Sequence, residues 1–259
     1  MSFPAAVTAN AAIAHFEPVF DRGFKDQIVI ALITLSTDNL TELEFRRMVP
    51  GDEVSFSSTR IKTHNPMTIE NLGNHAFEIA KAGELFDPTG CVPVFAYGCT
   101  SGSAIISQER LEQELHRTVP GSKLTSPMTG AFKAFEKLGI RKLAILTPYP
   151  DDVTQVMIKA LRTAGLEVVG AASFHIDNDF DVPDVSPESI IEAATVVTTA
   201  DADALFIPCT GLRTSSVIAT LESRLGKPVI TAHQAMLWDA LRLAGYQKPI
   251  HGFGRLLTV

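Results

Sequence analysis

The fold is decided by residues 94–101, whose sequence is Val-Phe-Ala-Tyr-Gly-Cys-Thr-Ser. The apolar start of this stretch predicts a short buried strand, and the Gly-Cys-Thr-Ser that follows predicts a turn into the start of a helix. A similar stretch, Leu-Phe-Ile-Pro-Cys-Thr-Gly, occupies residues 205–211. Two buried strands therefore each deliver a Cys-Thr pair to their carboxyl end, one at Cys99 and the other at Cys209.

Strands and helices alternate in the same order around both cysteines. In the first half, we expect strands at residues 27–33, 54–60, 92–96 and 123–125, and helices at 40–48, 68–86, 103–117 and 127–138. In the second half, we expect strands at 142–146, 166–174, 204–207 and 229–230, and helices that end at about 164, 199, 225 and 243. Strands that alternate with helices form parallel sheets, whose binding sites lie at the carboxyl ends of the strands.

This repeat predicts an α/β fold of two similar lobes, each a parallel sheet flanked by helices, with the site between the lobes. The sequence identity between the two halves is low, so the repeat is one of pattern. We expect the first lobe to comprise residues 1–127 plus 233–259, because the last helix can pack back on it. The second lobe then comprises residues 128–232.

The composition is that of an ordinary globular protein: of 259 residues, 46% are apolar and 20% are charged. The net charge of −7 argues against nucleic-acid binding, which needs a basic surface to displace counterions. The apolar runs fall short of the ~20 residues of a membrane span, and the start of the chain lacks the basic segment of a signal peptide. Three cysteines without a Cys-x-x-Cys motif fit a reducing compartment, so we expect a cytoplasmic protein without disulfides.

Cys99 and Cys209 can act as nucleophile or base only as thiolates. A helix N-terminus and nearby backbone N–H groups lower the pKa of a thiol from its ordinary value of ~8.5, and both cysteines precede an expected helix. The sequence therefore predicts two activated thiols around one small substrate. The neighbouring N–H groups can also hold a carboxylate or an enolate-like oxygen. These groups belong to Thr100, Ser101, Thr210 and Gly211.

Other roles for the cysteines stay open at this point. A single cysteine after an apolar strand is ordinarily a small core residue, and we expect this of Cys91, which stands at the beginning of a strand. A zinc site would need spaced Cys and His ligands, which neither Cys99 nor Cys209 has nearby in sequence, so no metal is expected. A non-catalytic two-lobed binder is another hypothesis, as is a cysteine–histidine hydrolase. The histidines available for the latter are His64, His75, His175 and His233.

Two further motifs accompany the Cys-Thr segments. Ser36-Thr37-Asp38 with Glu42 follows the first strand, and Thr147-Pro148-Tyr149 follows the first strand of the second half. With these motifs, residues 28–245 resemble the Asp/Glu racemase superfamily, and within it the branch of maleate cis–trans isomerases, arylmalonate decarboxylases and ectoine-utilization EutA-type proteins. The resemblance implies pseudo-symmetric lobes, no cofactor, no metal, and a small carboxylate between the two cysteines.

The resemblance also implies roles for single residues. Cys99 and Cys209 would be the catalytic pair: in a racemase one removes the α-proton and the other returns a proton from the opposite face. In a maleate isomerase, the cysteine that matches Cys99 adds to the double bond and the other moves the proton. Decarboxylases of this branch have glycine at the first position, so Cys99 counts against decarboxylation. Tyr149 and Asn178 match residues that bind a substrate carboxylate.

Asp38 departs from the pattern of the maleate isomerases, which carry Asn at this position. A carboxylate here would repel the second carboxylate of maleate and favour an ammonium or amide N–H, or it would cap the helix that starts near Leu40. We therefore expect a cofactor-independent racemase or isomerase of an amino-acid-like or N-acyl amino acid, closest to EutA-type proteins. The alternative is a maleate cis–trans isomerase, and an arylmalonate-type decarboxylase is disfavoured. We also expect a homo-oligomer that binds neither nucleic acid nor membrane.

Overall fold

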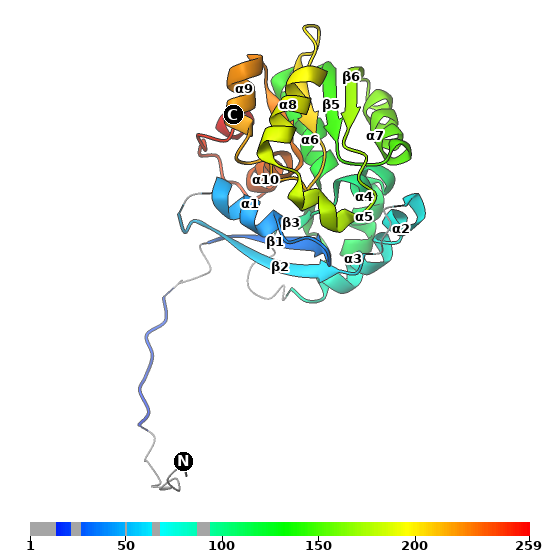
Figure 1. Cartoon of the computed structure of the whole chain (residues 1–259). Coiled ribbons are helices and arrows are strands. Elements are labelled where there is room, and N and C mark those ends of the chain that lie inside the picture. Colours follow the sequence, from blue (N-terminus) through cyan, green and yellow to red (C-terminus); the bar gives the residue numbers. More distant parts are fainter. Residues whose placement is uncertain (1–13, 22–26, 50, 64–67, 87–93) are drawn as a thin grey trace, which may run out of the picture.

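Two parallel four-stranded sheets form the framework of the chain (Figure 1). The computed structural model describes residues 14–21, 27–49, 51–63, 68–86 and 94–259, so Cys91 and His64 lie outside the described residues. The first sheet consists of β1 (Ile28–Leu35), β2 (Val54–Ile61), β3 (Val94–Tyr97) and β4 (Lys123–Thr125). The second consists of β5 (Lys142–Thr147), β6 (Glu167–Ser173), β7 (Ala204–Ile207) and β8 (Val229–Thr231).

The strand order is the same in both sheets, namely β2-β1-β3-β4 and β6-β5-β7-β8. Every neighbouring pair in these two orders is parallel. The first and third strands of each half are therefore neighbours in the centre of their sheet, where they are shielded on both sides. The predicted α/β fold of two similar lobes, each a parallel sheet flanked by helices, is confirmed.

Helices cover the sheets of both halves. The first half contains α1 (Thr41–Met48), α2 (Ile69–Gly73), α3 (Ala76–Gly83), α4 (Thr100–Ile105), α5 (Gln108–His116) and α6 (Pro127–Leu138). The second contains α7 (Asp151–Thr163), α8 (Pro187–Val197), α9 (Ile218–Leu225), α10 (Ala232–Leu243) and the short 3-10 helices η2 (Asp179–Asp184) and η3 (Leu256–Thr258).

Three of the helices expected from the sequence differ in the structure. The expected helix at 68–86 is divided into α2 and α3, and the one at 103–117 into α4 and α5. Ser107 accounts for the second break, because its hydroxyl accepts a hydrogen bond from the Arg110 N–H (3.2 Å) and so starts α5 as a new N-cap. The helix that ends at 225, which we expect to begin at Arg213, begins only at Ile218. This leaves a longer turn after β7.

The two halves share one hydrophobic core. A continuous buried cluster contains Ile30 and Leu32 of β1 together with Leu143 and Ile145 of β5. Helix α10 is buried from residue 232 to 241 and packs against α6, against β3 and β4 of the first sheet, and against β8 of the second (Figure 1). The division into residues 1–127 plus 233–259 and 128–232 stays a prediction.

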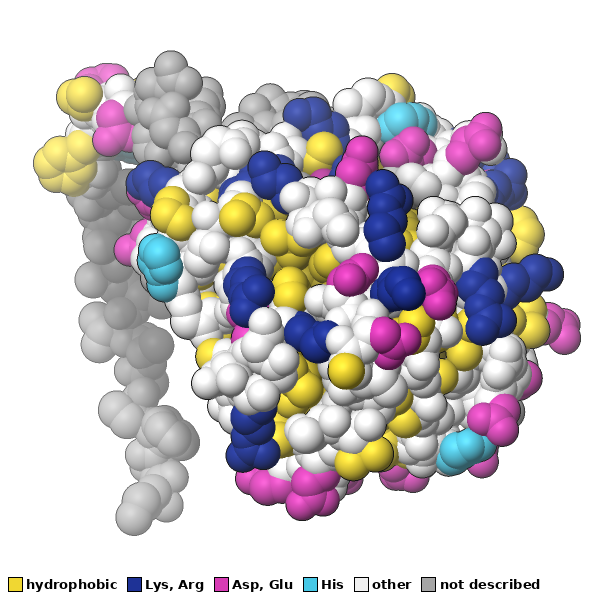
Figure 2. All heavy atoms as spheres, turned by 90° about the horizontal axis from the view of Figure 1, so that it is seen from above, with side chains coloured by type: hydrophobic (Ala, Val, Ile, Leu, Met, Phe, Trp, Pro, Cys, Tyr) yellow, Lys and Arg dark blue, Asp and Glu magenta, His cyan; other side chains and the backbone are white. Residues whose placement is uncertain are grey.

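The outer surface carries both signs of charge. On the face seen in Figure 2, Lys and Arg side chains alternate with Asp and Glu rather than forming one continuous basic stripe. In the described part of the chain, every helix is too short or too polar to cross a lipid bilayer. The expected cytoplasmic location and homo-oligomeric state stay predictions.

Candidate active site

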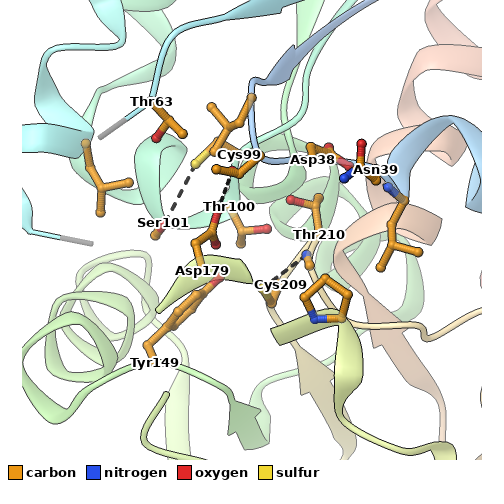
Figure 3. Close-up of a pocket in the computed structure, with 16 residues that line it drawn as sticks. Asp38, Asn39, Thr63, Cys99, Thr100, Ser101, Tyr149, Asp179, Cys209 and Thr210 are labelled. Atoms are coloured by element: carbon orange, nitrogen blue, oxygen red, sulfur yellow. Dashed lines mark hydrogen bonds between the residues drawn. The ribbon is translucent and has the colours of Figure 1, made fainter. Parts of the chain in front are cut away.

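The two Cys-Thr segments meet at one cavity between the halves. Strands β3 and β7 each end immediately before the turn that carries a cysteine, so both thiols lie at the carboxyl edge of a parallel sheet. Figure 3 shows Cys99 and Cys209 facing the same cavity, with Asp179 and Tyr149 beside them. The two equivalent strand ends thus build a single site.

Eight of the nine predicted site residues line this cavity. They are Cys99, Cys209, Asp38, Tyr149, Thr100, Ser101, Thr210 and Gly211. Asn178 is not among the lining residues: it is exposed, and its side chain caps η2 by accepting a hydrogen bond from the Phe180 N–H (3.3 Å). The catalytic and binding roles of all nine residues stay predictions.

Cys99 is the N-cap of α4. Its Sγ accepts a hydrogen bond from the Gly102 N–H (3.3 Å) and lies 3.7 Å from Ser101 Oγ. Burial is the larger effect and raises the pKa of the thiol to about 11, whereas these two contacts lower it. The expectation of an acidic thiol is therefore wrong: the helix N-terminus acts in the predicted direction, but desolvation outweighs it.

Cys209 stands in a turn rather than at a helix N-terminus, because α9 begins only at Ile218. Its Sγ accepts a hydrogen bond from the Gly211 N–H (3.2 Å). Burial, followed by the negative charge of Asp179, raises the pKa of this thiol to about 12, although the Gly211 hydrogen bond lowers it. Burial thus raises the pKa of both thiols.

Hydroxyl groups connect the two cysteine segments. The Thr210 hydroxyl donates to the Gly98 carbonyl (3.1 Å), which joins the turn after β7 to the turn after β3. The Tyr149 hydroxyl donates to the Pro208 carbonyl. The buried Thr100 hydroxyl has no hydrogen-bond partner within the described residues.

The Asp38 carboxylate caps α1. It accepts hydrogen bonds from the N–H groups of Leu40 (2.8 Å) and Thr41 (2.9 Å) and from the Thr41 hydroxyl (2.5 Å). Of the two roles that the sequence leaves open, the cap is thus observed. Because Asp38 also lines the cavity beside Asn39, contact with substrate stays a prediction.

Asp179 is a lining residue that the sequence analysis missed. It is half-buried at the start of η2, and its carboxylate accepts a hydrogen bond from the Thr37 hydroxyl of the first half. Burial raises the pKa of this carboxyl, and its charge in turn raises the pKa of both thiols. The acidic stretch 177–184 was the available signal, but the prediction fell on Asn178, one residue away.

The described histidines lie outside the cavity. His75 is buried against Tyr97, His175 is exposed, and His233 is buried on α10. Among the described residues that line the cavity, none is His, Lys or Arg. The hydrolase hypothesis therefore has no imidazole in the cavity wall in this part of the chain.

Comparison with known proteins identifies the family. The arylmalonate decarboxylase family matches residues 102–257 of this chain. Arylmalonate decarboxylase of Bordetella bronchiseptica is 32% identical over 192 residues, which cover 73% of this chain and 77% of that protein. The chain belongs to the arylmalonate decarboxylase family. The maleate isomerase of Nocardia farcinica is 24% identical over 240 residues, 88% of this chain and 94% of that enzyme. The predicted branch is confirmed, whereas closeness to EutA-type proteins stays a prediction.

Solved structures of both kinds of enzyme share the fold of this arylmalonate decarboxylase family member. One of them is a cysteine-to-serine mutant of the maleate cis–trans isomerase of Nocardia farcinica with a covalently bound succinylcysteine intermediate. It superposes on this chain with a TM-score of 0.82 at 20% identity, over 89% of this chain and 98% of that one. A liganded arylmalonate decarboxylase, with one glycine replaced by cysteine and one cysteine by serine, gives 0.79 at 23% identity over the same shares. At these identities the likeness establishes the fold.

Proposed function

We propose that this chain is a cofactor-independent isomerase of a small carboxylate that uses Cys99 and Cys209 on opposite sides of the substrate. The observation that carries the proposal is the presence of two thiols in one enclosed cavity, each delivered by the third strand of its half. Inversion at carbon, or rotation about a former double bond, needs a group on each side of the reacting atoms.

The environments of the two thiols support different roles. Cys99 is the N-cap of α4 and accepts the Gly102 N–H, whereas Cys209 stands in a turn where the negative charge of Asp179 opposes its ionisation. We therefore assign Cys99 as the thiolate of the pair and Cys209 as the acid. The N–H groups around both turns and the free Thr100 hydroxyl are suited to hold the carboxylate.

The first candidate reaction is cis–trans isomerisation of maleate. The Cys99 thiolate forms a carbon–sulfur bond to one carbon of the double bond, and the Cys209 thiol protonates the neighbouring carbon. After rotation about the resulting single bond, the Cys209 thiolate removes the other hydrogen of that carbon, which the rotation has brought opposite the carbon–sulfur bond. Cys99 then leaves as a thiolate, which yields the trans acid. The similarity to maleate isomerases over 87–88% of this chain supports this candidate, as does the succinylcysteine in a structural relative.

The second candidate is racemisation of an amino-acid-like or N-acylated substrate. It is supported by the two carboxylates in the cavity wall, Asp38 and Asp179, which disfavour a second negative charge on the ligand. Here the Cys99 thiolate would remove the α-proton and the Cys209 thiol would deliver a proton from the other face. If this candidate is right, the chain is closest to EutA-type proteins. Decarboxylation is the third outcome to test. Cys99 counts against it, because decarboxylases have glycine at this position.

Proton NMR in D₂O distinguishes these reactions. Purified protein is incubated with maleate, a panel of amino acids and N-acyl amino acids, and phenylmalonate, and the products are followed over time. Appearance of fumarate supports the first candidate, and deuterium at an α-carbon supports the second. Loss of carbon dioxide from phenylmalonate alone would contradict the isomerase proposal. Saturable binding of these acids without any turnover would indicate the two-lobed binder instead.

A further inference from the structure

We propose that a second pocket, separate from the cavity of the two thiols, binds a small organic anion through its phosphate or carboxylate head. The pocket has a volume of about 430 Å³ and lies where α1, α8 and the C-terminal segment meet (Figure 1). The described residues that line it are Arg47, Pro187, Arg213, Ser215, Ser216 and Phe253. None of these six lines the cavity of the thiols, so the inference goes beyond the proposed function.

The charge of the lining residues favours an anion. Two of the six are arginines, and none of the described lining residues is Asp or Glu. Arg47 stands in the last turn of α1 in the first half, and Arg213 stands in the turn between β7 and α9 in the second. Two guanidinium groups from separate segments therefore reach one pocket. A guanidinium group binds the oxygens of a phosphate or carboxylate with paired N–H donors.

Arg213 has a buried donor that the described protein groups leave unused. Its Nη2 donates to the Val185 carbonyl (3.0 Å), which fixes the guanidinium against the segment that leads into α8. Its Nε is buried and has no hydrogen-bond partner among the described residues. Buried polar atoms without a partner are rare, because they lose their hydrogen bonds to water without a replacement. An oxyanion in the pocket supplies the missing acceptor.

Glu44 holds the second arginine in place. The Nη1 of Arg47 donates to Glu44 Oε1 (3.2 Å), and the arginine side chain stays 48% exposed. Glu44 is fully buried, does not line the pocket, and shares its charge with the backbone N–H groups of Thr214 and Ser215. One of the five N–H donors of the Arg47 guanidinium is thus used for orientation. The others are available to an anion.

The remaining lining residues indicate an organic anion rather than a bare ion. Phe253 and Pro187 add an aromatic ring and an apolar ring to the pocket, and Ser216 is exposed beside them. A volume of about 430 Å³ is many times the ~30 Å³ of one water molecule. It falls in the range of small-molecule pockets, about 300–1,000 Å³. We therefore expect the anionic head at the two arginines and an apolar or aromatic body against Phe253.

Thermal unfolding of the full chain with three probes tests the proposal. Tm is followed by circular dichroism as phenyl phosphate, benzoate or inorganic phosphate is added, with sodium chloride at equal ionic strength as the blank. A ligand of the folded chain raises Tm once its concentration exceeds Kd. We expect phenyl phosphate or benzoate to raise Tm, and the tighter of the two identifies the head group. Inorganic phosphate should bind about tenfold more weakly than phenyl phosphate, because it has no ring to bury.

Two arginine variants locate the site. Arg47→Gln and Arg213→Gln each remove one guanidinium, and each should weaken binding of the tighter probe at least about tenfold, the effect of losing a hydrogen bond to a charged group. The matched control is Arg117→Gln. Arg117 forms the same i,i+3 pair with Glu114 (3.1 Å) at the end of α5 and does not line the pocket, so this variant should bind as wild type does.

Several results would overturn the proposal. One is a Tm that stays at the value of the salt blank with about 10 mM of each probe. Others are a shift that persists unchanged in Arg47→Gln, as binding beside the thiols would, equal weakening in Arg117→Gln, and equal binding of phenyl phosphate and inorganic phosphate. Arg213→Gln also removes the hydrogen bond to Val185, so Arg47→Gln decides alone if that variant fails to fold. The assay involves no turnover, so this result and the proposed reaction stand or fall separately.

Discussion

Glu44 links the first half of the molecule to the turn that follows Cys209. It is fully buried on α1 (0% exposed), and its Oε2 accepts hydrogen bonds from the N–H groups of Thr214 (3.1 Å) and Ser215 (2.7 Å). Its Oε1 accepts a third from the Ser215 hydroxyl (2.7 Å). Replacement of Glu44 by alanine would therefore leave three buried donors without their acceptor, two of them backbone groups, besides the exposed Arg47 guanidinium at 3.2 Å.

The size of the effect follows from these contacts. Each unsatisfied buried donor costs about 1–3 kcal/mol, and loss of one member of a buried charged network destabilises by about 3–5 kcal/mol. We expect Glu44→Ala to lower the free energy of unfolding by the latter amount. For a chain of this length each kcal/mol corresponds to about 2–4 °C, so Tm should fall by about 6–20 °C. Glu44→Gln keeps one oxygen for the two backbone N–H groups and should lose about 1–2 kcal/mol.

Urea denaturation followed by circular dichroism measures these differences. The matched control is Glu78→Gln, which removes the charge of an exposed carboxylate paired with Lys81 at 3.0 Å. Such a surface pair contributes little, so the control should stay within about 0.5 kcal/mol of wild type. If Glu44→Ala loses no more stability than this control, the reasoning that this carboxylate holds the two halves together is refuted.

Three further predictions concern protons. Because the pKa of the Cys99 thiol is about 11, its alkylation rate should rise roughly tenfold per pH unit between pH 7 and 9, and a plateau in this interval would contradict the account. Asp179→Asn removes the charge that opposes ionisation of both thiols and should speed alkylation of each several-fold, so slower alkylation of either would count against it. Burial lowers the pKa of His233 below its ordinary ~6.5. The unfolded chain therefore takes up this proton first, and the free energy of unfolding should fall as pH drops below about 6.5. Urea titrations at pH 7.5 and 5.5 should show this fall in wild type and a smaller one in His233→Asn. An equal fall in the free energy of unfolding in both proteins would contradict the prediction.

Local patterns in the sequence were sufficient for much of the site. The strand–Cys-Thr segments at 94–101 and 205–211 predict two thiols at equivalent strand ends, and the structure places both in one cavity. Asp38 stands two residues before Leu40, the N-cap of α1, and its carboxylate accepts the N–H groups of Leu40 and Thr41 at the start of that helix.

Other features depend on tertiary structure and have no local signal. Asp179, the first residue of η2, lines the cavity, whereas the predicted Asn178 precedes it as an extended, exposed N-cap. The contact between His75 and Tyr97 joins segments that are far apart in the chain. The raised pKa of the thiols reflects how deeply the two halves bury them, which overrides the favourable helix N-terminus at Cys99.

The claim that two thiols act together is tested most directly by comparing single cysteine variants on one substrate. With the acid that turns over in the D₂O panel, kcat should fall by about 10²–10⁴-fold in both Cys99→Ser and Cys209→Ser, the usual contribution of a positioned acid or base. Cys91→Ser, which changes the third cysteine, serves as the control. We expect large losses of kcat in both variants, with substrate binding retained. Turnover near the wild-type rate in either variant would contradict it.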